Sequence, residues 1–160
     1  MQQVVQEIKN LSIGFTSKKG EQISILKNIS TTIKKGETVG IVGESGSGKS
    51  TLALAMMGYV KHGLFTISGE CIYQSNDILK MKNRELENIR GRKIAMIPQN
   101  AGQSLTPNLK IGYQIDEALR LHTNFQKEDR DVKISELLNK VRLPSPETIA
   151  KRYPHELSGG

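Results

Sequence analysis

One octapeptide constrains the fold of this chain more than any other feature. Residues 43–50 read Gly-Glu-Ser-Gly-Ser-Gly-Lys-Ser, which fits the pattern G-x-x-x-x-G-K-[ST] of a phosphate-binding loop, the P-loop. The segment before it, 38–42 (TVGIV), is short, apolar and β-branched, which predicts a central strand buried on both faces. From Lys49 onward, Leu52, Ala55 and Met56 recur at helical spacing until Gly58, which predicts a helix and its end.

The residue types in this loop suit the chemistry of phosphate binding. Glycines let successive backbone amides turn inward around phosphate oxygens, and the following helix presents its positive N-terminus. In such a loop the lysine, here Lys49, reaches the β- and γ-phosphates, and the hydroxyl of Ser50 coordinates Mg²⁺. The alternative is a Gly/Ser-rich turn that happens to precede a lysine, but the flanking strand and helix favour nucleotide binding. The loop residues expected to line the site are Gly43, Gly46, Ser47 and Gly48.

Hydropathy patterns divide the remaining chain into two parts. Apolar residues alternate in 23–25 and 29–33, which predicts antiparallel strands in the first ~35 residues. A weaker strand is predicted at 69–74 and a helix at 83–90. Residues 94–97 (IAMI) predict a second buried strand, ended by Pro98.

After Gln99 the pattern becomes helical. Apolar residues recur at helical spacing in 111–119 and again in 134–141. Pro144, Pro146 and Pro154 are expected to break up this helical subdomain. We therefore predict a nucleotide-binding α/β core with an N-terminal β subdomain in 1–99, and a helical subdomain in 100–160.

Composition narrows the class of protein. The chain has 160 residues, 36% of them hydrophobic, which excludes a disordered chain. No apolar run approaches the ~18 residues of a membrane span, and the first ten residues lack a signal-peptide layout, so a cytoplasmic protein is predicted. A single cysteine, Cys71, excludes an internal disulfide. The net charge of +7 is scattered, and 3 Phe and 4 Tyr provide no stacking platform for bases, so nucleic acid is not an expected partner.

The end of the chain, 157–160, reads Leu-Ser-Gly-Gly and looks like the start of an LSGGQ signature. With the P-loop, Gln99 and the helical segment between them, the chain resembles the ATP-binding subunit of ABC transporters. The resemblance implies an α/β fold: a P-loop NTPase core of the RecA-like type, with an N-terminal antiparallel β subdomain and an inserted helical subdomain. It also implies ATP and Mg²⁺ as ligands.

The resemblance assigns roles to further residues. Gln99 is similar to the glutamine that touches Mg²⁺ or the attacking water, which makes it a catalytic candidate beside Lys49. Phe15 is similar to the aromatic residue that stacks on adenine, although Tyr is commoner there, and a core Phe is the open alternative. Thr51 is similar to the residue that bonds the α-phosphate. Ser158 and Gly159, with Gly160, are implied to contact the γ-phosphate of ATP held by an opposite subunit.

Two later parts of the family pattern do not occur in this sequence. These are the apolar strand ending in Asp-Glu, known as Walker B, which supplies the general-base glutamate, and the switch histidine. The pair Asp116-Glu117 does not replace the Asp-Glu of Walker B, because this pair lies in an amphipathic helical pattern where a solvated face is expected. We therefore expect residues 1–160 to be truncated before Walker B, to bind nucleotide weakly and to turn over essentially nothing.

Three short segments, 90–97 (RGRKIAMI), 104–107 (SLTP) and 152–156 (RYPHE), look like the oligopeptide, dipeptide and nickel import branch. Pro98 and 100–102 depart from that branch. The branch implies a head-to-tail ATPase dimer that powers solute import, with membrane permease subunits and, indirectly, an extracytoplasmic substrate-binding protein. It also implies a peripheral position on the inner face of the cell membrane. The alternatives are a soluble ABC ATPase acting on nucleic acid or ribosomes, and a non-hydrolysing nucleotide-binding module.

Overall fold

The computed structural model describes residues 3–157 and divides the chain into two compact units, 1–94 and 95–160. Each unit has a hydrophobic core of its own. Within the described range, none of the helices combines the length and the apolar character that crossing a bilayer demands. The two units are described separately below.

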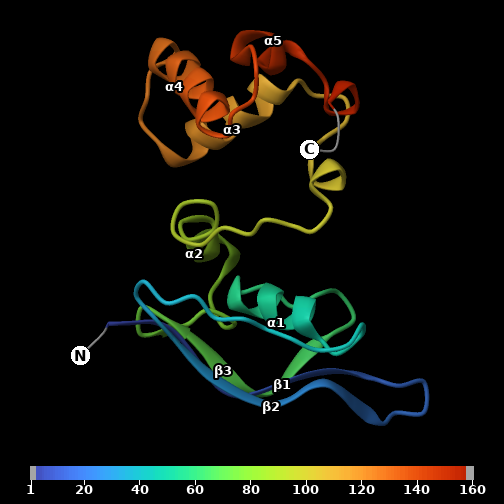
Figure 1. Ribbon diagram of the computed structural model, residues 1–160. Helices are drawn as coiled ribbons and strands as arrows, with labels where there is room; N and C mark the ends of the chain where they lie inside the picture. The colour runs from blue at the N-terminus through green and yellow to red at the C-terminus, as the bar shows by residue number, and fades with distance from the viewer. Residues whose placement is uncertain (1–2, 158–160) are drawn as a thin grey trace. The chain divides into compact units, whose positions relative to one another are not determined.

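The first unit is built on a four-stranded antiparallel sheet with strand order β2-β1-β3-β4 (Figure 1). This arrangement confirms the antiparallel strands predicted for the first part of the chain. It also confirms the predicted strand at 69–74, which begins earlier than expected. The strands are β1 (Val4–Thr16), β2 (Gln22–Lys34), β3 (Phe65–Tyr73) and β4 (Asn76–Asp77).

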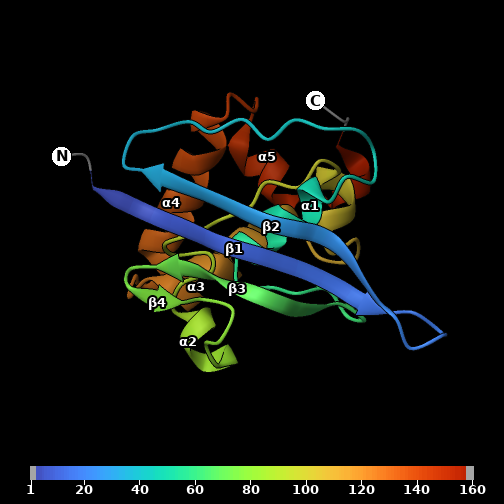
Figure 2. The same ribbon diagram turned by 90° about the horizontal axis from the view of Figure 1, so that it is seen from below.

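Helix α1 (Lys49–Met56) lies against one face of this sheet (Figures 1 and 2). Its buried side chains, Leu52 and Ala55, are on the face that the sequence predicts. Helix α2 (Asn83–Glu87) is shorter than the predicted 83–90 and adds Leu86 to the same core. Ile78, which follows β4, and Ile89, which follows α2, are also buried in this core. The sheet contributes the remaining buried side chains, which are Ile8, Leu11, Ile13, Leu26, Cys71 and Tyr73.

Gly58 ends α1 as predicted. Its φ of +71° lies in the left-handed region, which glycine occupies at little cost. The amide of Gly58 donates to Ala55 O at 2.9 Å, and the amide of Tyr59 donates to Leu54 O at 2.9 Å. This pair of bonds is a Schellman motif, and it satisfies two of the carbonyls that the end of a helix leaves without a partner.

The two predicted buried strands are wrong. Residues 38–42 form no strand, and the side chain of Val42 is 96% exposed. Residues 94–97 make only one isolated bridge, between Ile94 and Arg90, and Ile97 is 93% exposed. A strand in a parallel sheet forms its hydrogen bonds only with neighbouring strands. No strand in the described part of the chain pairs with either segment, so their apolar side chains stay in contact with solvent.

The second unit is helical, as predicted, and its buried residues are Ile111, Ile134, Leu138 and Ile149. Pro146 does not break a helix here but begins α5, because proline is favoured at the first helical position, where no amide donor is needed. Asp116, expected on a solvated face, is 22% exposed and bonds Arg130 Nε of the next helix at 2.6 Å. The elements are η1 (Ala101–Ser104), α3 (Ile111–His122), α4 (Lys127–Lys140), α5 (Pro146–Lys151) and η2 (Pro154–Glu156).

Candidate nucleotide-binding site

The predicted P-loop forms the turn that leads into α1. The amide of Ser47 donates to Glu44 O at 3.2 Å, which closes the first bend of the loop. Gly48 then adopts φ +89° and precedes the first residue of the helix. A Cβ at Gly48 would lie 2.7 Å from Leu26 Cδ2 on β2. Both the backbone angle and this close approach to the sheet therefore require glycine.

The side chain of Lys49 folds back over the loop. Its ammonium donates to Gly43 O at 2.8 Å and to Glu44 O at 2.6 Å, and it lies 3.4 Å from Ser47 Oγ. These bonds hold the positive charge at the loop rather than in bulk solvent. A phosphate group bound in the loop can therefore meet an ammonium that is already in place.

The first turn of α1 offers hydrogen-bond donors. Within residues 3–157, the backbone amides of Lys49, Ser50 and Thr51 have no acceptor, and the helix ladder begins with Leu52 N donating to Gly48 O at 2.9 Å. The first turn contains no acidic residue that could satisfy them. Free amides at a helix N-terminus, with the positive end of the helix dipole, form an anion site. The exposed hydroxyl of Ser50 lies in the same turn and suits a hard cation such as Mg²⁺.

The other predicted site residues are distributed over both units. Phe15 is half-buried near the end of β1, where it pairs with Ile23 of β2. Gln99 is exposed at a bend in the second unit. Ser158, Gly159 and Gly160 lie outside the described residues. The roles of all five stay predictions.

Sequence patterns did not indicate two further residues, Gln6 and Arg90. Both side chains bond the C-terminal end of α1 from distant parts of the chain. Neighbouring Cys71 is an inert thiol, because burial raises its pKa to about 11 and keeps it protonated.

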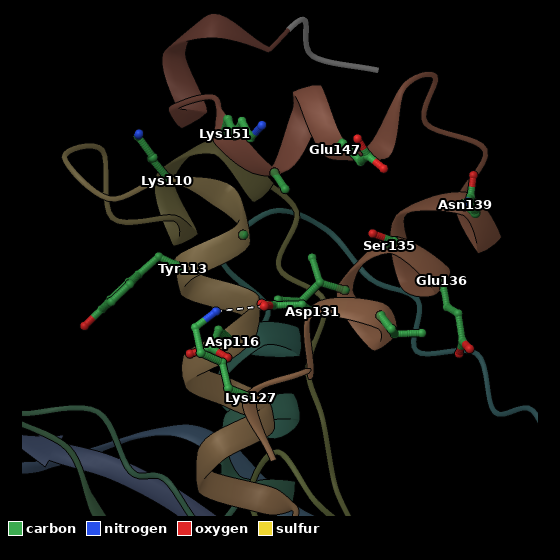
Figure 3. Close-up of a pocket in the computed structure, with 14 residues that line it drawn as sticks. Lys110, Tyr113, Asp116, Lys127, Asp131, Ser135, Glu136, Asn139, Glu147 and Lys151 are labelled. Carbon is green, nitrogen blue, oxygen red and sulfur yellow. Dashed lines mark hydrogen bonds and ion pairs between the residues drawn. The ribbon is translucent and has the colours of Figure 1, made fainter. Parts of the chain in front are cut away.

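A separate hollow of about 830 Å³ lies in the second unit between α3, α4 and α5 (Figure 3). Some charged groups on its rim are paired with neighbours: Lys127 bonds Asp131 at 2.7 Å, and Asp116 bonds Arg120 at 3.2 Å. Lys110, Glu147 and Lys151 also line the hollow and form no ion pair within residues 3–157, but they belong to no phosphate-binding pattern of the kind that residues 43–50 form around Lys49. The P-loop is the better candidate for a ligand site.

Comparison with known proteins agrees with this geometry. The family model described as "ABC transporter" matches residues 26–160, which include the whole P-loop, α1 and the helical unit. The chain belongs to the ABC transporter family.

Its curated relatives in this family include two named import proteins. The oligopeptide transport ATP-binding protein OppD of Bacillus subtilis is 38% identical over 96% of the chain, which covers 43% of that protein. The glutathione import ATP-binding protein GsiA of Escherichia coli K12 is also 38% identical over 96% of the chain, which covers 25% of that protein. The chain thus spans less than half the length of either relative.

Solved structures confirm the expected fold class. A dimeric ATP-binding cassette, MJ0796, bound to ADP and Pi, superposes with a TM-score of 0.82 at 29% identity, over 96% of this chain and 63% of that one. A second dimeric structure of the same bacterial ABC transporter cassette gives a TM-score of 0.81. The antiparallel sheet, the P-loop and the helical unit therefore belong to an α/β P-loop ATPase fold.

Proposed function

We propose that the chain is the nucleotide-binding part of an ATPase subunit that powers import of a peptide-like solute across the cytoplasmic membrane. The observation that carries this proposal is the P-loop of a chain in the ABC transporter family: the ammonium of Lys49 is held at the loop carbonyls, and the first turn of α1 leaves its amides free. The names of the relatives, which refer to oligopeptide transport and glutathione import, support a peptide-like solute.

The proposed residue roles rest on the chemistry of the P-loop and, for Thr51, Gln99 and Phe15, on the resemblance to the family. The loop amides and Lys49 bind and orient the β- and γ-phosphates of ATP, and Thr51 bonds the α-phosphate. Mg²⁺, when bound, supplies additional neutralisation of phosphate charge, and Ser50 and Gln99 are the residues proposed to hold it. Phe15 is proposed to stack on adenine through its π-face. Hydrolysis itself requires a group that orients water, and that group is proposed to come from the whole subunit.

The proposed assembly is a head-to-tail pair of ATPase subunits. In it, residues 158–160 of one subunit cover the P-loop of the other, and the pair works with integral membrane permeases at the inner face of the membrane. An extracytoplasmic substrate-binding protein is an indirect partner. The dimeric state of the solved cassettes supports the pairing. Nucleotide binding and hydrolysis are proposed to close and reopen this pair.

Purification of the full-length subunit from detergent-solubilised membranes tests the import proposal. We expect an integral membrane protein to co-purify with it, and addition of an oligopeptide mixture with the cognate binding protein to stimulate phosphate release in the reconstituted complex. Salt-sensitive retention of the subunit on nucleic acid, without a membrane partner, contradicts import and indicates the soluble class instead.

Magnesium dependence tests the proposed role of Ser50. For the wild-type chain, we expect EDTA to weaken ATP binding by roughly tenfold or more, because the metal neutralises the phosphates that the loop holds. Because Gln99 is proposed to hold the ion as well, the Ser50→Ala variant should lose most, but not all, of this magnesium effect in titration calorimetry. Ser68→Ala, which removes an exposed hydroxyl on β3, should retain the wild-type magnesium effect. A full magnesium effect in Ser50→Ala would show that another residue holds the ion.

A further inference from the structure

The C-terminal end of α1 is bonded more completely than its N-terminal end. A helix leaves its last four carbonyls without intrahelical partners. The Schellman motif at Gly58 satisfies the carbonyls of Leu54 and Ala55. The carbonyls of Met56 and Met57 accept hydrogen bonds from side chains that lie elsewhere in the first unit. All four carbonyls are therefore satisfied, and two of them bind α1 to other elements.

The first of these side chains is Gln6 of β1. Its Nε2 donates to Met56 O at 2.7 Å and lies 3.3 Å from Cys71 Sγ. Gln6 is only 6% exposed and is the one buried polar side chain among the described residues. Because burying an amide is unfavourable without hydrogen bonds, these contacts fix both the rotamer of Gln6 and the end of α1.

The second side chain is Arg90, which follows α2. Its Nε donates to Met57 O at 2.9 Å, and its Nη2 donates to Gly58 O at 2.8 Å. The planar guanidinium thus binds two successive carbonyls as a rigid fork, which a lysine cannot do. Its positive charge also lies at the negative end of the α1 dipole, where the last turn of α1 has no basic residue of its own.

The backbone that carries Arg90 is itself held in a compact turn. The amide of Arg90 donates to Leu86 O at 2.8 Å, and the amide of Lys93 donates to Ile89 O at 2.8 Å. The amide of Gly91 donates to Ile94 O at 2.9 Å, and Ile89 is buried in the core. The guanidinium is therefore presented to α1 from a fixed position.

We propose that Gln6 and Arg90, named here the α1 socket, are positioning residues that hold the P-loop helix in place for phosphate binding. Helix α1 has 8 residues, whereas an isolated helix needs about 12–15 to be stable in water. Its N-terminal amides must stay free to meet phosphate, so its position is fixed from the opposite end. This inference rests on the proposed nucleotide-binding function.

Arg90→Met tests the socket, because methionine keeps much of the side-chain volume but removes both donors and the charge. Arg92→Met is the matched control, since Arg92 is exposed two residues further on and has no hydrogen bond or ion pair among residues 3–157. Gln6→Met removes the other donor. Arg90→Lys keeps the positive charge but replaces the guanidinium fork with a single ammonium group. This variant allows the test to be made if Arg90→Met does not fold.

Two readouts on the 160-residue chain separate positioning from general stability. Native-state hydrogen exchange of the α1 amides should be about tenfold faster or more in Arg90→Met and Gln6→Met, while the amides of β1 are unchanged. The Kd for magnesium-ATP, measured where circular dichroism shows the variants to be folded, should rise about tenfold. Arg90→Lys should recover part of both effects, and Arg92→Met should match the wild type.

Each contrary result has one meaning. If exchange of the α1 amides in Arg90→Met and Arg90→Lys equals that of the wild type, the socket does not hold the helix. If exchange is faster but the folded variants bind magnesium-ATP with the wild-type Kd, the socket is structural only and the positioning role is overturned. If the wild-type chain takes up no magnesium-ATP, the proposed function fails together with the positioning role, while the exchange result still decides whether the socket holds α1.

Discussion

Lys49→Ala is expected to weaken binding of magnesium-ATP to the 160-residue chain by about two orders of magnitude, because two charge-assisted hydrogen bonds to phosphate, worth about 1.5 kcal/mol each, are lost. The ammonium is already held at the loop by the carbonyls of Gly43 and Glu44, so little ordering of the side chain remains for nucleotide binding to impose. Titration calorimetry at fixed ionic strength measures the change in Kd directly.

The control for Lys49→Ala is Lys61→Ala. Lys61 is exposed in the first unit, and its removal lowers the net charge of the chain by the same single unit. Any weakening of ATP binding that both variants share reflects the loss of one positive charge, which reduces the long-range attraction between the basic chain and the polyanionic nucleotide. A Kd for Lys49→Ala that equals the Kd for Lys61→Ala would show that the P-loop lysine makes no specific phosphate contact, and the proposed site would be wrong.

Features fixed by a few neighbouring residues could be predicted from the sequence. The start of α1 at Lys49, its buried face and its end before Gly58 all depend on residues within one or two helical turns. The antiparallel pair β1 and β2 was predictable for a similar reason, since alternating apolar residues and a short connection specify a hairpin locally.

Features that depend on distant partners could not be predicted in this way. Residues 38–42 have the apolar, β-branched composition of a buried strand, but composition does not supply the neighbouring strands that bury it. Val39 and Ile41 are 40% and 45% exposed as a result. The same reasoning applies to residues 94–97, whose pattern predicts the interior of a sheet although Met96 is 43% exposed.

The candidate site also contains residues that a local sequence pattern predicts and residues that depend on distant contacts. The spacing of the P-loop predicts Lys49 and Ser50 as site residues, because the motif is contiguous. Arg90 and Gln6 contact α1 across 33 and 50 residues of sequence, and no local pattern links them to the P-loop. One signal for Gln6 was present in the sequence. Gln6 and buried Ile8 are two residues apart in β1, and side chains two apart in a strand point to the same face of the sheet. The polar side chain of Gln6 is therefore placed on the core face, where it needs a hydrogen-bond partner.

Gly58→Ala is expected to destabilise the chain by about 3 kcal/mol, a large fraction of the total for a domain of this size. The left-handed backbone costs a side chain about 1–2 kcal/mol. A Cβ at Gly58 would also lie 2.7 Å from Leu86 Cδ2 and 2.9 Å from the backbone oxygen of Ile78, and such overpacking typically costs about 1–3 kcal/mol. Urea unfolding, followed by circular dichroism, measures the loss of unfolding free energy.

Gly36→Ala separates these two contributions. Gly36 has φ +77°, close to that of Gly58, but a Cβ there would meet nothing within 4 Å. Its replacement should therefore cost only the backbone term, about 1 kcal/mol. The difference between the two variants gives the cost of inserting a methyl group between α1, α2 and the residues that follow β4. Equal losses would mean that α1 can shift to accept the methyl group, and the end of this helix would then be less firmly held than its hydrogen bonds indicate.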